Sequence, residues 1–379
     1  MTTAPPSLPA DVAALLPTPC MLVDVAACER NITRAARYFE STHAKLRPHF
    51  KAHKCTKLLA RQVAAGGCVG VTCATAMEAE VLADNGFADI LVANQVVTCS
   101  SLASLARAAC SCDITVVIDD HDHIAALDSV ASAAGVEFGV LIEVDVGMHR
   151  CGLEPGSEQL LALARATAAA KPLTLRGLQG YEGHAVSLAA RSERREQVQQ
   201  AGAILAAERA RLLEAGYPCP IVSGGGTGTF DLAAQAGVLD EIQAGSYVLM
   251  DADYARLDLP FENALLVVST LLSHPRPGVA TIDAGLKALT AERGMPLVLH
   301  DGLVVHRLAD EHAWLSVPDG ESLRIGQQIF LVPAHVDPAI NLHDVLFAWD
   351  SDSCKLDAWP VDGRRVESRE TAPGLRASV

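Results

Sequence analysis

The chain has 379 residues, half of them hydrophobic and a fifth charged, so it can bury a large core and general disorder is excluded. The formal net charge of −15 removes any general electrostatic reason to bind nucleic acid or an anionic membrane. No apolar run approaches the roughly 18 residues of a transmembrane helix, and residues 1–12 lack the basic and apolar regions of a secretory signal. Eleven cysteines, an odd number, favour free thiols over a disulfide framework. We therefore expect a soluble, cytoplasmic α/β protein.

Short β-prone runs alternate with Ala-rich helical stretches from about residue 20 to residue 250. Such alternation is typical of βα units around a parallel sheet, and eight units close a barrel of about 250 residues. Nine strands are predicted, so one is expected to lie outside the barrel. They are Met21–Asp24, Leu46–Lys51, Cys68–Cys73, Ile90–Ala93, Ile114–Ile118, Val140–Asp145, Leu175–Tyr181, Ile221–Ser223 and Glu241–Tyr247.

The pattern changes after Tyr254, where helical runs give way to short β-prone segments separated by Gly and Pro. This texture predicts a compact antiparallel β domain. The predicted fold class is thus α/β: a (β/α)8 TIM-type barrel followed by a smaller, mostly antiparallel β domain. We place an N-terminal extension and first strand at residues 1–24, the barrel at 25–257 and the β domain at 258–379. Residues 1–17 and 366–379 are expected to fray.

Lys51 lies in the run Arg47–Lys54, at the end of the second predicted strand. Active sites of βα barrels lie at the carboxyl ends of strands. Neighbouring Arg and His side chains would supply positive charge, which lowers the pKa of a lysine and helps it to form a Schiff base. The same run also reads as a solvated basic turn.

Arg150 follows another predicted strand, in the run Glu143–Gly152. It would project at the same barrel mouth as Lys51, or it would simply cap the barrel by pairing with Asp145. The spacing alone leaves both readings open.

Two Gly-rich loops follow the last two predicted barrel strands, at Ser223–Thr229 and Gln243–Tyr247. Free backbone N–H groups and hydroxyls in such loops can surround an anion, and TIM barrels often hold phosphate after strands 7 and 8. The loops therefore favour phosphate binding, with flexible tight turns as the other reading.

His335 and Asp337 are two residues apart in the predicted β domain. In an extended strand they would point to one face and could reach one divalent cation. A hydrogen-bonded pair at a turn gives the same spacing. The polar cluster Asp310–His312 is equally ambiguous in isolation.

Taken together and in this order, these motifs resemble the fold-type III pyridoxal-phosphate enzymes, the group that includes alanine racemase. Within it the chain is most similar to the D-threonine aldolase and D-serine dehydratase family, on the aldolase side. The resemblance runs from Thr18 to about Val361. It rests on seven motifs: the Lys51 and Arg150 runs, the two Gly-rich loops, the His335–Asp337 pair, Asp283–Lys287 and Asp310–His312.

The resemblance implies a role for each of nine residues. Lys51 would bind pyridoxal 5'-phosphate covalently, and Arg150 would hydrogen-bond the phenolic oxygen of the cofactor. Tyr181 would lie against its ring. Thr227, Gly245, Ser246 and Tyr254 would contact its phosphate and ring, and His335 and Asp337 would bind a metal ion. The resemblance also implies a homodimer with shared active sites.

The chain departs from the aldolase pattern at two places, Ala74 and Glu182–His184. We expect both to line the substrate side of the site, so the resemblance identifies the cofactor more firmly than the substrate.

Pyridoxal phosphate supplies the electron sink, and the protein chooses which bond at Cα breaks. A metal beside the β-hydroxyl favours either aldol cleavage or loss of hydroxide. His335 with Asp337 is an N/O pair that suits Mn²⁺ or Mg²⁺ better than Zn²⁺, as in the aldolases. We therefore predict a lyase that cleaves D-β-hydroxy-α-amino acids such as D-threonine, D-allo-threonine and D-phenylserine. The alternatives are a 3-hydroxy-D-aspartate aldolase, a D-serine or D-3-hydroxyaspartate dehydratase, an amino-acid racemase and a non-catalytic carrier of the cofactor.

Overall fold

The computed structural model describes residues 8–364, in which the strands form two sheets. The barrel strands are β2 (Lys45–Leu46), β3 (Val71–Cys73), β4 (Asp89–Val92), β5 (Asp113–Ile118), β6 (Phe138–Glu143), β7 (Leu173–Gly180), β8 (Ile221–Gly224) and β9 (Glu241–Ile242). They are parallel, in the order β2-β9-β8-β7-β6-β5-β4-β3. Parallel bridges join Leu46 to Cys68 and His49 to Thr72, so the two ends of the sheet meet and the barrel closes.

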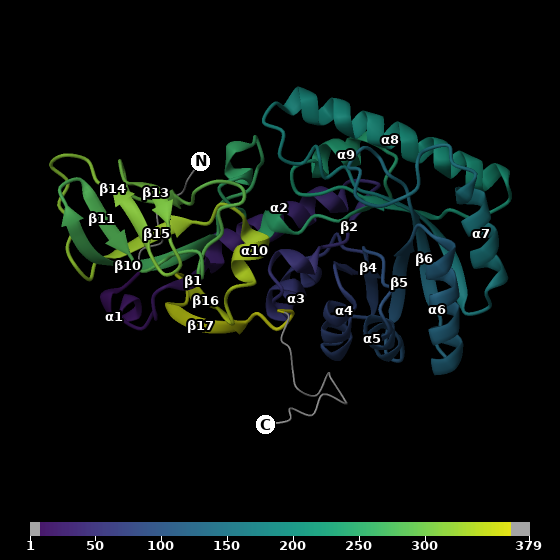
Figure 1. Cartoon of the computed structure of the whole chain (residues 1–379), viewed down its shortest axis with the longest axis horizontal. Helices are drawn as coiled ribbons and strands as arrows, with labels where there is room; N and C mark the ends of the chain where they lie inside the picture. The colour runs from purple at the N-terminus through teal and green to yellow at the C-terminus, as the bar shows by residue number, and fades with distance from the viewer. Residues whose placement is uncertain (1–7, 365–379) are drawn as a thin grey trace.

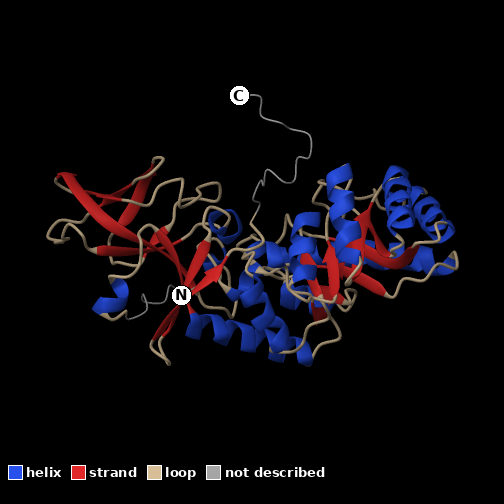
Figure 2. Ribbon diagram, turned by 90° about the horizontal axis from the view of Figure 1, so that it is seen from below, coloured by secondary structure: helices blue, strands red, loops and turns tan. Residues whose placement is uncertain are grey.

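Helices surround this sheet, as Figures 1 and 2 show. They are α2 (Val25–Glu40), α3 (Thr56–Ala64), α4 (Ala76–Asp84), α5 (Cys99–Ala109), α6 (His121–Ala134), α7 (Gln159–Ala169), α8 (Arg191–Glu214) and α9 (Phe230–Ala236). Side-chain oxygens cap the N-termini of several of them, because the first backbone N–H groups of a helix have no partner within it. Asp24 accepts from Ala27, and Thr75 accepts from Glu78. The predicted alternation of strands and helices is confirmed.

The second sheet is mostly antiparallel and contains nine strands (Figure 1). They are β1 (Cys20–Asp24), β10 (Leu265–Arg276), β11 (Val279–Ile282), β12 (Leu297–Val298), β13 (Val304–Leu308), β14 (Ala313–Ser316), β15 (Gln328–Val332), β16 (Val345–Asp350) and β17 (Lys355–Pro360). Strand β1 pairs antiparallel with β10 and parallel with β16. The first strand of the chain therefore lies outside the barrel, and the predicted fold class is confirmed. The exact domain limits, residues 24/25 and 257/258, stay predictions.

Several elements differ from those predicted. The second strand ends at Leu46, not Lys51, because Pro48 has no N–H for the ladder and the chain then turns into the 3-10 helix η1 (Phe50–Ala52). The run predicted as Glu241–Tyr247 is a strand only to Ile242 and then forms the 3-10 helix η2 (Ser246–Val248). A further short one, η3, spans Tyr254–Arg256. Strands β12, β14 and β17 were not predicted.

The N-terminal segment expected to fray contains a short helix, α1 (Ala10–Ala13). Residues 1–7 and 366–379, which were also expected to fray, lie outside the described residues. All eleven cysteines are free thiols. No helix in residues 8–364 is long and apolar enough to cross a membrane.

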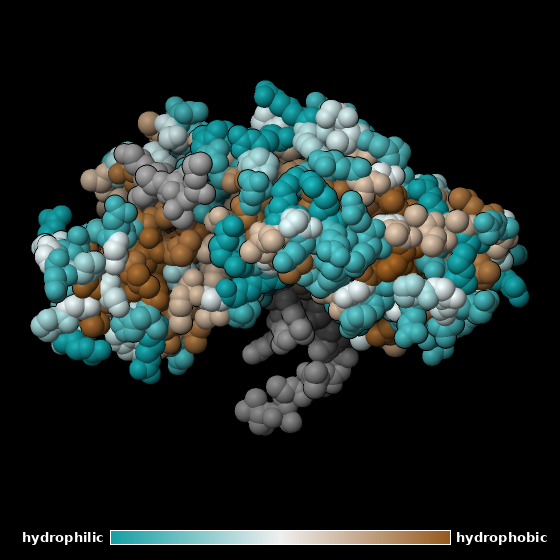
Figure 3. Space-filling model, turned by 90° about the horizontal axis from the view of Figure 1, so that it is seen from above, coloured by the Kyte–Doolittle hydropathy of each residue, from teal (hydrophilic) through white to brown (hydrophobic). Residues whose placement is uncertain are grey.

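The core runs through both halves of the molecule. Buried Val, Ile and Leu of the barrel strands continue into the buried face of β10 and β11, so one apolar cluster spans the two sheets. Figure 3 shows a largely hydrophilic face above α8, with apolar side chains in separate areas. Helix α10 (Val336–Ile340) lies at the junction of the two halves (Figure 1), where the candidate site is found.

Candidate active site

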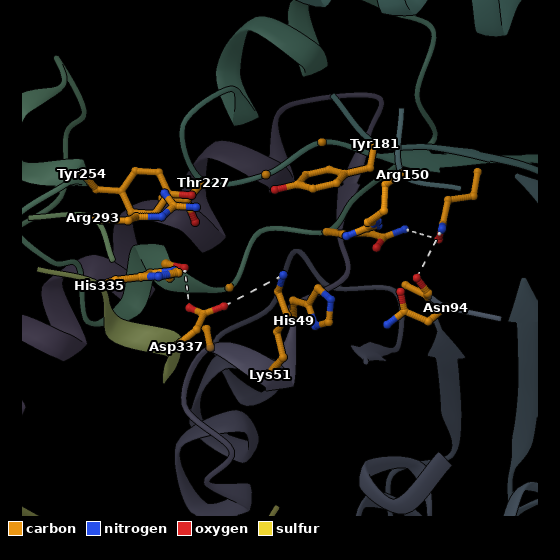
Figure 4. A pocket seen from close by; sticks show the side chains of 18 residues that line it. His49, Lys51, Asn94, Arg150, Tyr181, Thr227, Tyr254, Arg293, His335 and Asp337 are labelled. Atoms are coloured by element: carbon orange, nitrogen blue, oxygen red, sulfur yellow. Dashed lines mark hydrogen bonds and ion pairs between the residues drawn. The ribbon is translucent and has the colours of Figure 1, made fainter. Parts of the chain in front are cut away.

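One cavity opens at the carboxyl end of the barrel, against the β domain. It encloses about 790 Å³ of space between atoms, its open mouth included. All nine predicted site residues line it: Lys51, Arg150, Tyr181, Thr227, Gly245, Ser246, Tyr254, His335 and Asp337. They come from segments almost 290 residues apart in the sequence, and the fold brings every one of them together (Figure 4). Their chemical roles remain predictions.

Lys51 lies in η1 and extends into the middle of the cavity (Figure 4). Its Nζ is 3.9 Å from Oδ2 of Asp337, so the amine of the barrel meets the carboxylate of the β domain. Ser246 donates its hydroxyl to the other oxygen of Asp337, at 3.3 Å. Lysine and carboxylate are thus held side by side at the boundary of the two halves.

The positive surroundings expected for Lys51 are largely absent. Arg47 pairs with Asp89 and Glu241, the first residues of β4 and β9, so its charge is used at the amino end of the barrel. Burial lowers the pKa of His49 well below its usual value and that of His53 to about 4. Both imidazoles are therefore neutral at pH 7, and the expectation that this run supplies positive charge to Lys51 is not met.

Arg150 and Tyr181 form the barrel side of the cavity. The guanidinium carbon of Arg150 is 5.7 Å from the centre of the Tyr181 ring, within the range of a cation–π contact. The alternative reading, a pair between Arg150 and Asp145, is not formed, since Asp145 accepts from the ring and the backbone of His149. Burial raises the pKa of Tyr181 to about 12, so its phenol stays protonated and can donate a hydrogen bond.

The two Gly-rich loops form adjoining walls of a cup after β8 and β9. A Cβ on Gly245 would lie 2.5 Å from the carbonyl oxygen of His49, and one on Gly228 would lie 1.8 Å from that of Val186. These close approaches require glycine. The hydroxyl of Thr227 accepts from the backbone N–H of Tyr247 at 3.0 Å, which ties the two loops together.

These residues fit pyridoxal phosphate. The cup offers glycine backbone and hydroxyls to a phosphate, Lys51 offers an amine, and Arg150 with Tyr181 offers a cationic and aromatic wall. His49 is buried at the cavity and its Nδ1 has no hydrogen-bond partner within residues 8–364. A buried polar atom without a partner is costly, and a bound cofactor would give it a neighbour.

His335 and Asp337 both reach the cavity, but not from an extended strand as predicted. His335 precedes α10 and Asp337 lies in its first turn, where Pro338 is tolerated because early helix positions need no N–H donor. His335 bonds through Nδ1 to Glu292 at 2.6 Å, which leaves Nε2 for another partner. Such a carboxylate–histidine contact orients imidazoles that bind metals.

The two donors fit a metal site with two protein ligands. Among the residues that the structure describes, no group of three or more His, Cys, Asp or Glu side chains is arranged to hold a metal ion. Water or substrate would have to fill the remaining positions. The cluster Asp310–His312 does not line the cavity, and its Glu311 pairs with Lys287 instead.

Neither departure from the family pattern lines the cavity, so the expectation that both do is wrong. Glu182 is buried and accepts from the hydroxyl of Thr229 at 2.6 Å and from the N–H of Gly225 at 3.3 Å. It supports the Gly-rich loop from below. Ala74 contributes its backbone carbonyl, which accepts a hydrogen bond from the side-chain amide of Asn94 at 2.7 Å.

Five polar residues of the cavity were not predicted individually as site residues, although His49 and Gln243 lie in predicted motifs: His49, Asn94, Gln179, Gln243 and Arg293. The first four lie in or just after barrel strands, which is a usable signal in a TIM barrel. Gln243 donates to Gln179 at 3.0 Å, and Gln179 donates to Glu143 at 3.3 Å, so a buried carboxylate fixes both amides. Burial raises the pKa of Glu143. Arg293 lies in a loop of the β domain and had no such signal.

Comparison with known proteins gives a consistent relationship along the whole chain. Residues 23–253 match the family "alanine racemase, N-terminal domain", and residues 264–349 match a putative serine dehydratase domain. The chain is 37% identical to a D-threonine aldolase of an Arthrobacter species, over 95% of this chain and 96% of that protein. The chain belongs to the alanine racemase-like family that contains D-threonine aldolase. The resemblance found in the sequence is confirmed.

Two further relatives define its place in this family. A 3-hydroxy-D-aspartate aldolase of Paracoccus denitrificans is 35% identical, over 95% of each chain. The crystal structure of D-threonine aldolase from Filomicrobium marinum superposes with a TM-score of 0.88 at 38% identity, over 92% of this chain and 96% of that one. The family implies pyridoxal phosphate as cofactor, and the aldolase relatives support lyase activity.

Proposed function

We propose that this protein is a pyridoxal-phosphate- and divalent-metal-dependent aldolase that cleaves D-β-hydroxy-α-amino acids to glycine and an aldehyde. D-Threonine, D-allo-threonine and D-phenylserine represent the substrate type. One observation carries the proposal: Lys51 lies in one cavity between the Arg150–Tyr181 wall and the His335–Asp337 pair, with 3.9 Å between its amine and Asp337 (Figure 4).

The barrel side would hold the cofactor. Lys51 would bind it covalently, Arg150 and Tyr181 would orient its ring, and the Gly-rich cup would hold its phosphate through Thr227 and Ser246. Gly245 and Tyr254 complete the predicted contacts. When bound, pyridoxal phosphate accepts the electrons of the bond that breaks at Cα.

The β-domain side would hold the metal. His335 and Asp337 offer one nitrogen and one carboxylate, a donor set that suits Mn²⁺ or Mg²⁺ better than Zn²⁺. A divalent cation held there would supply Lewis acidity at the β-hydroxyl.

The chain's own residues determine which protons can move and which groups stay fixed. The Lys51 amine can hold a proton at Nζ, next to the Asp337 carboxylate. The phenol of Tyr181 stays protonated because burial raises its pKa to about 12. The Glu143–Gln179–Gln243 chain keeps two amides of the cavity in one orientation. Thr227 and Ser246 are buried, so the cup excludes most water.

The stereochemistry follows from the two-sided cavity. Lys51, Arg150 and Tyr181 would hold the cofactor on the barrel side, so the substrate would face His335 and Asp337 on the β-domain side. A D-amino acid would direct its β-carbon toward this pair, and an L-amino acid would direct it away. Selection is therefore expected to be strict at Cα for D and loose at Cβ.

The test is the initial rate on the four threonine stereoisomers with Mn²⁺ present. We expect glycine and acetaldehyde from D-threonine and D-allo-threonine, and neither product from the L forms. Comparable rates on L-threonine or L-allo-threonine would contradict the proposal.

A dehydratase is the second candidate, because residues 264–349 match the serine dehydratase domain. It would release a keto acid and ammonia from D-serine or D-3-hydroxyaspartate, which product analysis distinguishes. Racemisation needs no metal and would leave His335 and Asp337 without a purpose. A non-catalytic carrier would not need the β domain. The predicted homodimer is tested by light scattering of the purified protein.

A further inference from the structure

Arg293 is a cation of the cavity that the proposed chemistry does not use. It lies in the loop between β11 and β12, and its side chain lies beside Tyr254 and His335 on the β-domain side (Figure 4). The two other permanently basic side chains of the cavity, Lys51 and Arg150, have roles toward the cofactor.

The position of Arg293 is fixed by contacts across the junction. Its Nη1 donates to Oδ2 of Asp253 at 2.8 Å and to the hydroxyl of Ser187 at 2.9 Å. Ser187 also donates to Asp253, at 3.0 Å. A guanidinium held at one nitrogen by two partners is oriented, and its other nitrogens can bind a second group.

The charge of Arg293 is not fully compensated by these contacts. Asp253 is shared with a second arginine, because its other oxygen accepts from Arg256. Two guanidinium groups thus share the one carboxylate that lies at salt-bridge distance. The side chain of Arg293 is 35% exposed, so this charge can meet a ligand at the cavity.

The other acidic groups nearby do not bond to Arg293. Asp251 is close enough to stabilise its charge, but the Asp251 carboxylate accepts the backbone N–H groups of Tyr254 and Val336. Glu292 bonds to His335, and Asp337 accepts from Ser246. Within the described residues Arg293 thus has Asp253 as its one ion-pair partner at salt-bridge distance.

We infer that Arg293 binds the side-chain carboxylate of an acidic D-β-hydroxy-α-amino acid, so that 3-hydroxy-D-aspartate is preferred over D-threonine. The inference rests on the proposed function, which brings the β-hydroxyl to His335 and Asp337. A carboxylate on the same β-carbon then lies beside the hydroxyl, next to the guanidinium that adjoins His335. Arginine suits this task because its planar fork matches a carboxylate.

The reaction on this substrate balances without a further reactant. The Cα–Cβ bond breaks, the hydroxyl proton leaves as the C=O bond forms, and Cα gains a proton. The products are glycine and glyoxylate, and the glyoxylate keeps the carboxylate that Arg293 binds. From this substrate the enzyme would therefore release a two-carbon oxo acid, whereas D-threonine would give the neutral acetaldehyde.

Kinetics on two substrates test the inference. The variants are Arg293→Gln, Arg293→Lys and the control Arg256→Gln, which removes the other arginine from Asp253 but does not line the cavity. Arg293→Gln is expected to lower kcat/KM for 3-hydroxy-D-aspartate by about 100-fold and for D-threonine by less than about 3-fold. The ratio of kcat/KM for 3-hydroxy-D-aspartate to that for D-threonine should be intermediate in Arg293→Lys, between the wild type and Arg293→Gln. Arg256→Gln should keep the wild-type ratio. Equal losses on both substrates would show that Arg293 binds the shared α-carboxylate, and an unchanged ratio would show that it binds neither; either result overturns the inference.

Binding of unreactive analogues separates this inference from the proposed function. D-Aspartate and D-asparagine have the same shape and differ in charge, and their binding to the holoenzyme can be followed by the visible absorbance of the cofactor. The wild type should bind D-aspartate at least about tenfold more tightly, and Arg293→Gln should abolish this difference. Failure to cleave any β-hydroxy amino acid while this difference is present would refute the aldolase alone. Cleavage without the difference would refute the role of Arg293 alone. If Arg293→Gln has a lowered melting temperature, Arg293→Lys is compared instead, and it should reduce the difference without abolishing it.

Discussion

The two sides of the cavity are built in different ways. On the barrel side, Thr227, Gly245 and Ser246 are buried and lie in loops that follow neighbouring strands and bond to each other. On the β-domain side, His335 and Arg293 are partly exposed and lie at the start of a five-residue helix and in a long loop. Loops on a rigid scaffold vary most easily without loss of the fold. The rigid barrel side suits a cofactor that must stay in place. The β-domain side suits residues that select the substrate, since substrate preference differs among relatives.

The largest effect is expected on the barrel side at Lys51. Lys51→Ala should abolish turnover, because no amine remains to bind the cofactor covalently or to transfer a proton to Cα. We expect a loss of activity of more than about 10³-fold. Borohydride reduction of the holoenzyme should attach the cofactor to the peptide that contains Lys51. Lys287→Ala is the matched control, since this lysine pairs with Glu311 away from the cavity. Finding the label on Lys54 or Lys287 would refute the assignment.

On the β-domain side, Asp337→Ala should remove the metal but leave the cofactor in place. The expected loss of activity is several kcal/mol of transition-state stabilisation, or about 10²- to 10³-fold, because the Lewis acid is lost. Mn²⁺ titration monitored by electron paramagnetic resonance should show weaker binding, and the visible spectrum should be retained. EDTA treatment of the wild type should reproduce the variant, and added Mn²⁺ should restore it. Full activity after thorough chelation would contradict the metal-dependent mechanism.

A smaller effect is expected from Gly245→Ala, which tests how tightly the barrel side is built. The new Cβ would lie 2.5 Å from a backbone oxygen, so the phosphate cup must widen. The dissociation constant for pyridoxal phosphate should rise by about 10-fold, or about 1.4 kcal/mol. Gly202→Ala in α8 is the control, because its Cβ would meet its nearest neighbour at 3.6 Å, an ordinary contact. Equal affinities in both variants would show that the cup is not rigid.

The last effect concerns the pH dependence of stability and leaves catalysis aside. His53 is buried, and its Nε2 forms a hydrogen bond with Oε1 of Gln62 at 2.9 Å. Burial lowers the pKa of this imidazole from 6.5 to about 4. The unfolded chain therefore binds a proton that the folded chain does not between pH 6.5 and pH 4. Stability is complete above pH 6.5 and should fall as the pH decreases through this window, by roughly 1–3 kcal/mol. In thermal unfolding from pH 7 to pH 4.5, His53→Gln should show a smaller decrease than the wild type; parallel curves would refute this account.

The sequence was most informative where chemistry depends on position along barrel strands. The strand-to-loop runs around Lys51 and Arg150, and the two Gly-rich loops, were identified because strand ends of a parallel barrel meet at one mouth. The His335–Asp337 pair was also identified, though with the wrong local structure. An extended strand and the first turn of a helix can both bring residues two apart to one cavity. Here the helix begins directly after His335, and the N–H of Val336 bonds to Asp251.

Other features could not be read from the sequence because they depend on long-range contacts. Glu182 appeared to be a substrate-side residue, but its carboxylate is turned under the Gly-rich loop by Thr229 and Gly225. Arg47 appeared to add charge near Lys51, but Asp89 and Glu241 draw it to the other end of the barrel. Arg293 had no strand end, glycine or spacing to mark it, and only the packing of the β domain against the barrel brings it to the cavity.

The pairing of β1 with β16 has a consequence for synthesis of the protein on the ribosome. Met21 lies opposite Leu346, so the first strand of the chain cannot pair with its parallel neighbour until more than 320 further residues have been synthesised. Until then one edge of β1 is exposed, and exposed edges recruit other strands. The two domains therefore cannot be separated by one cut: a fragment ending at residue 257 would keep β1 without its sheet, and the complementary fragment would lack its central strand. We expect neither half to fold alone, whereas a fragment of residues 258–364 should recover its missing strand from an added peptide spanning Cys20–Asp24.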